Sequence, residues 1–551
     1  MKKIAVLFVT FVLLFSMMPV NAASNTKYKS TRRPVAVTQL VKVKQPVAET
    51  VKTVQPTKET VTTVQPTAET VTTVKPTTEP VSTVQPIEQP VAQPTNSVSV
   101  LDFGAKGDGT TDDTAAIQKA IDSASTSGAV LVFPASTGTY RINSTLILKD
   151  NTSISGKGAT LFMPSQDSPK VMLKSTENSY IKNVTIEGLS LKSNNDRNGT
   201  DYLVDSLTSN VLGIYILGID TLTIKDVRMD DMYNGLKLGA SLNGVDNYNV
   251  KINNLQIINS STPLLMGATN GFTMTDSILD AGAGNSHWLH SAYIDWGNTN
   301  LLFENTKFIN SPGSGVNVGA GDESKKAPTA IKFENCSIEN SNRGFNIYDS
   351  SVVTVSNTSI KKCNLAFSLS NASNVTIDNV NISEAKTDVA NSNIASDKGA
   401  FAINNTKNTT ITNVTVDANG MGGSLFELMN KTDNITISNM NAKNMDDIGF
   451  FYNNSLSNNF IVEKSNFEWT NISNPRLSFR GSGANATFRN NTFINKGNLY
   501  LAIADNYAGT SIKLENNSYS GFKSLSYSED YSVTQNNLNL DNNTYDANKN
   551  V

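Results

Sequence analysis

The sequence predicts a parallel β-solenoid for residues 96–551, preceded by an export signal at 1–22 and a spacer at 23–95. The main observation is a pattern that recurs from about residue 180: Val/Thr-x-Ile-x-Asn-Val-x-Ile, a polar gap, then Gly-apolar-x-apolar. Its base period of 22 to 26 residues is typical of one solenoid coil. The second observation is the alternation of apolar and polar residues within each short strand, which turns one side of the strand inward.

The first 22 residues contain the three parts of a secretory signal peptide. Lys2 and Lys3 form the charged start, residues 4–18 the apolar stretch, and Val-Asn-Ala at 20–22 the small-residue cleavage pattern. A membrane anchor is the alternative, but the apolar run is short for a span and small residues follow it. We therefore expect a secreted, extracellular protein with no membrane span after removal of the signal.

The segment 23–95 differs in composition from the rest of the chain. Within 34–95, proline recurs every ten residues among Thr, Val and Gln, with no aromatic residue. Such a segment cannot bury enough apolar surface to offset its chain entropy, so we expect a disordered, partly polyproline-like spacer. A basic arm at 27–44 precedes it. Contact with an anionic cell-wall polymer is one interpretation of this arm, and a solvated arm is the one that we favour.

Charge and cysteine content exclude two classes of protein. The 551-residue chain has a formal net charge of −3, and its body is more acidic than the whole, so we expect no nucleic-acid partner. Cys336 and Cys363 are the only cysteines, which excludes a disulfide-stapled module. Cys336 occupies a core-facing repeat position and Cys363 does not occupy the equivalent one. We therefore expect two thiols.

Each repeat carries one Asn-type residue at the corner between two strands. We expect these side chains to stack and to hydrogen-bond along the solenoid, as side-chain ladders do in stacked sheets. A β-propeller would need blades of about 40 residues with antiparallel hairpins, and the hairpin signals are missing. The corner positions are Asn183, Asp226, Asn254, Asp276, Asn305, Asn335, Asn357, Asn379, Asn413, Asn439, Lys464, Asn490, Asn516 and Asn542.

The start of the body does not follow the repeat. Residues 114–121 come after Asp113 and place Ile117 and Ile121 on one helical face, which predicts an N-capped amphipathic helix. A solenoid has open ends, so we expect this helix to cap the exposed core and strand edges of the first coil.

The residues around this helix carry a family resemblance. VLDFGAKGDGTTDDTAAIQ at 100–118 resembles the opening motif of the pectate-lyase-like superfamily, and Phe133-Pro134 and Gly138-Thr139-Tyr140 also fit it. That superfamily includes rhamnogalacturonases, polygalacturonases and epimerase-like β-helix proteins. The resemblance implies a single-stranded right-handed parallel β-helix and, usually, action on a polysaccharide. It also implies that the ligand lies over the Gly-apolar-x-apolar strand.

The outward residues of that strand form two columns along the solenoid. The first column is Tyr215, Lys237, Leu265, Tyr293, Asn317, Asn346, Ser368, Ala402, Glu427, Phe451, Ser478 and Ala502. The second column is Leu217, Gly239, Gly267, Asp295, Gly319, Tyr348, Ser370, Asn404, Met429, Asn453, Arg480 and Ala504. We expect the three glycines of the second column to leave a floor that a ligand can approach closely.

Aromatic and ionisable side chains gather near the middle of these columns. Residues 285–296 contain both histidines and two of the three tryptophans of the chain. Tryptophan can lie on a sugar ring, and histidine transfers protons near neutral pH; packing of an insertion onto the coil is the alternative. We predict catalytic roles for Lys237, His290, Tyr293 and Asp295. We predict substrate contacts for His287, Trp288, Trp296, Asn317, Arg343 and Tyr348.

The reaction type depends on which groups can pair. A glycosidase needs two carboxylates about 5 to 9.5 Å apart, so Asp295 would need a partner from a flanking turn. The candidates for this partner are Asp230, Asp231, Asp322 and Asp349. A lyase or epimerase instead needs a base and a group that neutralises the uronate carboxylate, roles open to Lys, Arg, His and Tyr.

The superfamily's own signatures narrow the choice only partly. The motifs of polygalacturonases (Asn-Thr-Asp, Asp-Asp, Gly-His-Gly and Arg-Ile-Lys) are incomplete in this sequence. Many lyases of the superfamily use calcium held by aspartates. Calcium is therefore a candidate cofactor, although no compact Asp cluster on the columns indicates its site.

Two functions follow from the sequence. We expect a secreted protein that cleaves an extracellular, uronate-containing polysaccharide by lyase or glycoside hydrolase chemistry. The alternative is a non-catalytic surface adhesin or glycan-binding rod, which the incomplete signatures, the Asn/Ser/Thr-rich faces and the spacer favour. A phage-type tail spike is disfavoured by the signal peptide.

Overall fold

The structure is a computed structural model that describes most of residues 96–545. The predicted signal peptide at 1–22 and spacer at 23–95 lie outside the described residues. Within 96–545, the segments not described are 135–137, 166–169, 177–178, 195–209, 240–245, 283–288, 321–324, 385–397, 420, 422–423, 446–448, 456–457, 471–475, 482–484, 497–499, 506–510, 522–524, 528–537 and 540–541.

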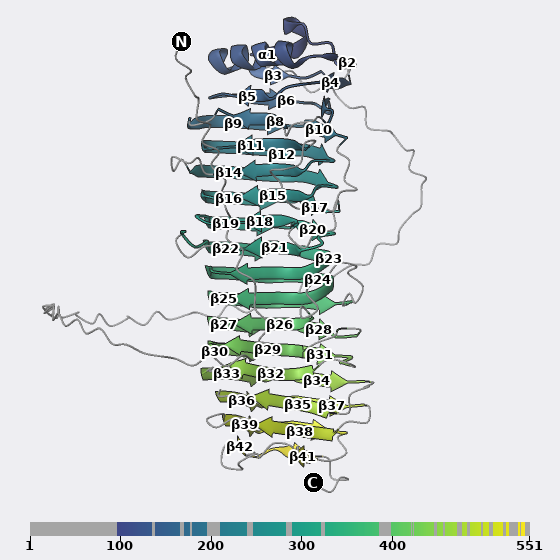
Figure 1. Cartoon of the computed structure of the whole chain (residues 1–551), viewed down its shortest axis with the longest axis vertical. Coiled ribbons are helices and arrows are strands. Elements are labelled where there is room, and N and C mark those ends of the chain that lie inside the picture. The colour runs from purple at the N-terminus through teal and green to yellow at the C-terminus, as the bar shows by residue number, and fades with distance from the viewer. Residues whose placement is uncertain are drawn as a thin grey trace, which may run out of the picture. The chain divides into compact units, whose positions relative to one another are not determined.

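The described body is the parallel β-helix that the repeat predicted (Figure 1). Strands pair in parallel with their equivalents in the preceding and following coils. Each coil contributes to three sheets, which we call the first, second and third sheets in the order of the chain. Five long strands bend at a corner and continue from one sheet into the next, so the three sheets form one continuous hydrogen-bonded network.

The first sheet contains β1 (Ser97–Ser99), β3 (Val130–Val132), β6 (Ser153–Ser155), β9 (Ile181–Glu187), β12 (Ile219–Asp230), β14 (Asn247–Ile258), β16 (Thr269–Thr275), β19 (Thr299–Glu304), β22 (Thr329–Glu334), β24 (Ser351–Ser370), β25 (Ser373–Ser383), β27 (Lys407–Thr412), β30 (Asp433–Ser438), β33 (Asn458–Glu463), β36 (Asn485–Arg489), β39 (Ser511–Glu515) and β42 (Leu538–Asn539). The later parts of β12, β14, β24 and β25 continue into the second sheet.

The second sheet also contains β2 (Asp108–Asp112), β4 (Thr139–Arg141), β7 (Thr160–Met163), β10 (Ser190–Ser193), β17 (Ile278–Asp280), β20 (Lys307–Ile309), the start of β23 (Ser337–Tyr348), β28 (Thr415–Asp417), β31 (Asn441–Lys443), β34 (Asn466–Trp469), β37 (Thr492–Asn495), β40 (Ser518–Ser520) and β43 (Thr544–Tyr545).

The third sheet contains the ends of β23 and β24 together with β5 (Leu146–Leu148), β8 (Lys170–Ser175), β11 (Val211–Ile216), β13 (Asn234–Leu238), β15 (Thr262–Met266), β18 (Ala292–Ile294), β21 (Ser314–Val318), β26 (Gly399–Asn404), β29 (Ser424–Asn430), β32 (Gly449–Ser455), β35 (Arg476–Gly481), β38 (Tyr500–Asp505) and β41 (Leu525–Tyr527).

The Asn-type corner between the first and second sheets has the conformation that explains its composition. All fourteen predicted corner residues have a positive φ, between 48° and 57°, a region that Asn and Asp tolerate better than most residues. Asn379 Nδ2 donates to Asn357 Oδ1 at 2.7 Å, and Asn254 Nδ2 donates to Asp226 Oδ1 at 2.7 Å. The predicted ladder is therefore present.

Further asparagine columns, which the repeat pattern did not predict, occupy other corners. Asn340 Nδ2 donates to Asn310 Oδ1 at 2.7 Å where the second sheet turns towards the third. Asn434 Nδ2 donates to Asn408 Oδ1 at 3.1 Å near the start of the first sheet. We call the second of these, which runs from Asn249 to Asn459, the entry column.

The interior is filled by inward side chains from all three sheets. Phe345, Phe367, Phe401 and Phe426 are buried and lie one above another in consecutive coils. Their ring centroids are 5.4, 5.3 and 5.9 Å apart and the rings are nearly parallel, an arrangement within the favourable range for aromatic pairs. The core is thus continuous along the helix axis.

A helix, α1 (Thr114–Ser127), packs beside β1, β3 and β5 at the N-terminal end of the stack (Figure 1). Its buried side chains include Ile117 and Ile121. Asp112 Oδ1 accepts a hydrogen bond from the Thr114 N–H at 3.0 Å, while the Asp113 carboxylate makes no cap hydrogen bond to the helix. It accepts hydrogen bonds from the N–H groups of Lys106 and Gly107 at 2.6 and 2.9 Å, so Asp113 fixes the glycine-rich turn of the opening motif.

Both cysteines are buried thiols, as expected, with exposures of 3% for Cys336 and 5% for Cys363. Burial raises the pKa of the Cys336 thiol to about 11, which keeps it protonated and unreactive near neutral pH. In the described part of the chain, no helix is both long and apolar enough to cross a bilayer.

Candidate functional site

The backbone pairing of the third sheet determines which side chains of the two predicted columns are neighbours. From Tyr215 to Glu427 the first column has the predicted register. The prediction is wrong after that point, because Tyr452 rather than Phe451 pairs with Glu427, and Arg480 pairs with Tyr452. The middle of the columns, where the candidate site lies, is unaffected.

Two tyrosines meet at this position although they come from different coils. Tyr293 lies in β18 and Tyr348 ends β23, and their hydroxyl oxygens are 3.3 Å apart. Asn317, between them in β21, donates from Nδ2 to Tyr348 Oη at 3.4 Å. Asn346 Nδ2 in turn donates to Asn317 Oδ1 at 2.7 Å. Three of the predicted site residues therefore form one hydrogen-bonded group. We call Tyr293, Asn317 and Tyr348, together with Asp295, the tyrosine cluster.

Gly319 allows the Tyr348 ring to reach back over a neighbouring coil. A Cβ at Gly319 would overlap Tyr348 Cζ, so any side chain there would displace the ring. The expectation of an open glycine floor is therefore wrong at Gly319. It is also wrong at Gly239, where the Tyr215 ring lies within 3.1 Å of the added Cβ position. At Gly267 the nearest group is the Trp296 carbonyl oxygen at 3.6 Å.

Asp295 lies one position beyond β18 and is partly buried beside the tyrosines. Burial raises the pKa of its carboxyl to about 6, although a hydrogen bond from the Trp296 N–H at 2.9 Å and the charge of Lys325 lower it. Burial also raises the pKa of both Tyr293 and Tyr348, with a contribution from the nearby Asp295 charge. A carboxyl that titrates near neutral pH can exchange protons under working conditions.

Lys325 is a member of the site that the sequence analysis missed. Its Nζ lies 5.5 Å from the centre of the Trp296 ring, and its charge acts on Asp295. It lies in the connection after β21, outside the repeated pattern, so column alignment gave no signal for it. A cation beside an indole ring suits an acidic sugar, because the cation can pair with the carboxylate and the indole can pack on the apolar face of the sugar ring.

His290 packs against Tyr293 of the tyrosine cluster. It is only 5% exposed, its Nδ1 accepts a hydrogen bond from the Ser314 N–H at 2.9 Å, and its ring centre is 5.4 Å from that of Tyr293. This geometry orients the Tyr293 ring. His287 and Trp288 lie outside the described residues.

The other two predicted basic residues lie farther along the third sheet. Lys237 is separated from Tyr293 in its column by Leu265, and its Nζ lies 4.7 Å from the centre of the Tyr215 ring. Arg343 is half-buried in β23, where it pairs with Ser314 and Leu365. The structure thus separates Lys237 from the tyrosine cluster by two coils.

The candidate carboxylate partners of Asp295 differ in their surroundings. Asp230 accepts two hydrogen bonds from Arg228, at 2.7 and 2.8 Å, and Asp231 accepts one from Asn259 at 2.6 Å. Asp349 acts electrostatically on Tyr348, and Asp322 lies outside the described residues. Among the residues that the structure describes, no group of three or more His, Cys, Asp or Glu side chains is placed to hold a metal ion.

Two family models match the chain. Residues 97–166 match the family described as rhamnogalacturonase A/epimerase, pectate lyase-like, and residues 294–427 and 326–493 match the right handed beta helix region. The first match covers the opening motif and α1, and the second begins directly after Tyr293 and includes Asp295, Asn317 and Tyr348.

Curated relatives match shorter parts. The tail spike protein of Shigella phage Sf6 is 31% identical over 150 residues, which are 25% of this chain and 23% of that protein. Alginate lyase 7 of Azotobacter vinelandii is 49% identical over 67 residues, which are 11% of this chain and 8% of that protein. The matches therefore span less than a quarter of the length of either relative.

One solved structure shows the same fold over most of the chain. The N-terminal fragment of gene product 12 of bacteriophage phi29 aligns with 77% of this chain and 87% of its own length, with a TM-score of 0.51 and 13% identity. The opening motif, the repeated coils and these matches agree. Together they support a right-handed parallel β-helix that is similar to the pectate-lyase-like superfamily.

Proposed function

We propose that this protein is exported and cleaves an extracellular, uronate-containing glycan by β-elimination on the third-sheet face. The observation that carries this proposal is the tyrosine cluster, in which one carboxyl lies beside two phenol hydroxyls and a lysine charge. Export is supported by the signal-peptide pattern at 1–22. The match to alginate lyase 7 over 67 residues supports the class of substrate.

The cluster contains one group for each role that an elimination needs. Asp295, with a pKa of about 6, is largely ionised at neutral pH and accepts the proton from C5 of the sugar. The C4–O4 bond then breaks as the C4=C5 double bond forms. The raised pKa of Tyr348 keeps its hydroxyl protonated, so it donates that proton to the leaving oxygen and recovers one from solvent.

Other residues of the site bind rather than react. Lys325 neutralises the uronate carboxylate, which lowers the pKa of the C5 proton, and Trp296 provides a surface for a sugar ring. Asn317 and His290 position Tyr348 and Tyr293. Lys237 and Arg343, which lies at the edge of the third sheet, contact sugar units farther along the polysaccharide.

Elimination fits the cluster better than hydrolysis because hydrolysis needs a second carboxylate at a defined distance. Asp230 and Asp231 are held by their hydrogen bonds from Arg228 and Asn259. Asp349 accepts a hydrogen bond from Asn371 Nδ2 at 2.8 Å. Calcium stays a candidate cofactor for neutralising the uronate, beside Lys325.

The test is product release from polygalacturonate, alginate and rhamnogalacturonan, each with and without calcium. We expect an unsaturated, ultraviolet-absorbing product from one of them. Asp295→Asn and Tyr348→Phe should each lower kcat by about 10²- to 10⁴-fold, while Asp417→Asn on the second sheet should leave it unchanged. Reducing ends without unsaturation would indicate hydrolysis instead, and activity retained by both site variants would remove the tyrosine cluster from the mechanism.

A non-catalytic adhesin is the second candidate function. The single perturbed carboxyl of the cluster and the Tyr348 ring that fills the space over Gly319 favour it. Under this alternative, wild-type protein binds at least one of the three polysaccharides but releases no product from any of them, with or without calcium.

A further inference from the structure

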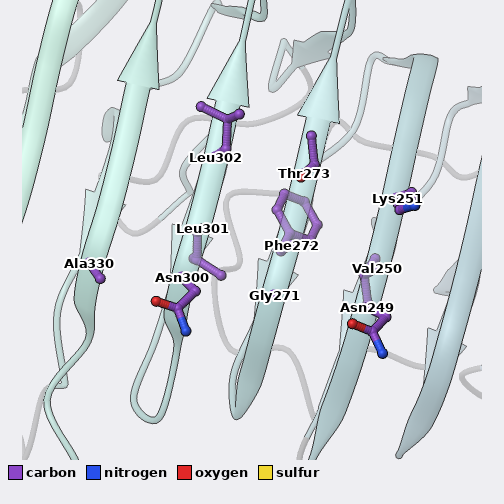
Figure 2. Close-up of a pocket in the computed structure, with 10 residues that line it drawn as sticks. All are labelled: Asn249, Val250, Lys251, Gly271, Phe272, Thr273, Asn300, Leu301, Leu302 and Ala330. Atoms are coloured by element: carbon purple, nitrogen blue, oxygen red, sulfur yellow. The ribbon is translucent and has the colours of Figure 1, made fainter.

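The first sheet carries a hollow that the third-sheet site does not use. It has a volume of about 310 Å³ and opens on the outward face of β14, β16 and β19 (Figure 2). This volume is at the lower end of the range for small-ligand sites. The residues that line it are Asn249, Val250, Lys251, Gly271, Phe272, Thr273, Asn300, Leu301, Leu302 and Ala330.

The hollow exists because the entry column is interrupted. Gly271 occupies the place between Asn249 and Asn300 (Figure 2), and like them it has a positive φ, which is +79° for Gly271 and +53° and +56° for its two neighbours. From Asn374 to Asn459 the asparagines of the column form an unbroken ladder, as Asn434 does with Asn408. Gly271 has no amide to do so, and a Cβ there would meet nothing closer than 3.7 Å. Space and the Asn249 amide oxygen are thus left facing outward.

Apolar side chains form the floor on one side of this gap. Leu302 is half-exposed in a column whose neighbours are Thr273 and Lys332. Ala330 and Val352 follow in the entry column at φ values of +55° and +53°. Val352 is 48% exposed. A β-branched residue at positive φ is rare and costs free energy, and such strain concentrates at functional positions.

Aromatic and polar groups border the same area. Tyr248 precedes Asn249 in the chain and is 37% exposed, and its ring centre is 6.3 Å from that of Tyr180, which is 43% exposed. These two rings lie outside the lining of the hollow, near the carboxylates of Asp220 and Asp246. Lys251 contributes an exposed cation, and Thr273 and Asn300 contribute hydroxyl and amide groups. Within the hollow, the aliphatic floor beside hydrogen-bonding groups and a cation suits the apolar faces, hydroxyls and carboxylate of acidic sugars.

We propose that this hollow is a second glycan-binding subsite that holds about two acidic sugar units of a chain segment separate from the one on the third sheet. Hydroxyls bond to Asn249 and Asn300, a carboxylate pairs with Lys251, and a ring face packs on Leu302. The inference rests on the proposed function only for the class of ligand. Two subsites on different sheets would raise the effective concentration of polymer at the third sheet.

The test compares variants that close the hollow with one that opens a gap elsewhere. Gly271→Asn places asparagine, the common residue of the entry column, at a positive φ that asparagine tolerates. Leu302→Thr places threonine, the common residue at the position of Leu302 in neighbouring coils, so both variants should fold. Asn408→Gly is the matched control, because it interrupts the same column three coils or more away. All are made with Asp295→Asn, and binding to polygalacturonate, alginate and rhamnogalacturonan is measured by cosedimentation, with thermal unfolding as a check of folding.

We expect Gly271→Asn and Leu302→Thr to weaken binding of at least one polymer by 5- to 20-fold, and Asn408→Gly to change it by less than 2-fold. Any of three results would overturn the subsite: both hollow variants bind as the parent does, the control is weakened as much as they are, or the parent protein binds none of the polymers. Product release by otherwise wild-type chains separates the two proposals. If hollow variants lose binding but no variant or parent cleaves, the subsite stands and the elimination falls. If cleavage occurs and the hollow variants bind as tightly as the parent, the elimination stands and the subsite falls.

Discussion

At the scale of single residues, the candidate site depends on a glycine whose missing side chain makes room for a large aromatic ring. Gly319 leaves room for the Tyr348 ring, which crosses back to Tyr293 and buries the region beside Asp295. The resulting loss of hydration is what raises the pKa of the Asp295 carboxyl. The same packing that builds the cluster therefore sets its proton affinity.

This raised pKa makes stability depend on pH in a defined direction. The folded carboxyl has a pKa of about 6 and the unfolded one about 3.9. The folded state therefore binds more protons between those values, and its contribution to stability is lost as the pH rises through this window. Asp295→Asn should remove this loss, so relative to wild type it should gain up to about 3 kcal/mol in unfolding free energy between pH 4 and pH 7.5.

Urea unfolding of both proteins at the two pH values measures this change. Because the other titrating groups are common to both chains, the difference between variant and wild type isolates Asp295. A difference that is the same at pH 4 and pH 7.5 would contradict a raised pKa.

The repeat allowed some members of the site to be predicted and concealed others. Tyr293, Asn317 and Tyr348 were predicted as neighbours because aligning the repeats places equivalent positions of successive coils side by side. Lys325 lies in an insertion whose path the period does not determine. The contact of Tyr348 with Tyr293 across Gly319 also escaped prediction, because column order indicates which backbones are adjacent and not where a long side chain leans.

At the scale of strands and corners, the asparagine columns combine two separate effects. The corner needs a positive φ, which Asn tolerates, and the amide groups then hydrogen-bond from coil to coil. The composition of this corner could be predicted from the repeat. The register beyond Glu427 could not, because consecutive Phe residues at 450 and 451 make the inward and outward positions of that strand indistinguishable by alternation.

The two effects can be separated at Asn379. Asn379→Ala should cost about 1 to 3 kcal/mol, because it loses the 2.7 Å bond to Asn357 and places a Cβ without a compensating amide at φ +52°. Asn379→Gly should cost less, since it loses the hydrogen bond but relieves the backbone. Denaturant unfolding gives both values. A larger loss for Gly than for Ala would show that backbone strain is not the main term at this corner.

At the scale of the whole β-helix, each coil contacts only its neighbours, so stability is expected to be a sum of local terms. The phenylalanine stack is one path by which adjacent coils depend on each other. Phe367 lies between Phe345 and Phe401, is fully buried, and is nearly parallel to both, with interplanar angles of 7° and 2°. A cavity at this position therefore removes contacts from the coils on both sides at once.

Phe367→Ala should destabilise the β-helix by about 3 to 5 kcal/mol, whereas Phe367→Leu should cost clearly less because it leaves a smaller cavity. In a one-dimensional stack the loss should also be local. Amide hydrogen exchange should accelerate most in β23, β24 and β26, less in β21 and β29, and little in β9 or β36. Uniform acceleration across all described strands would instead mean that the helix unfolds as a single cooperative unit, and that a change at one coil reaches both the tyrosine cluster and the hollow on the first sheet.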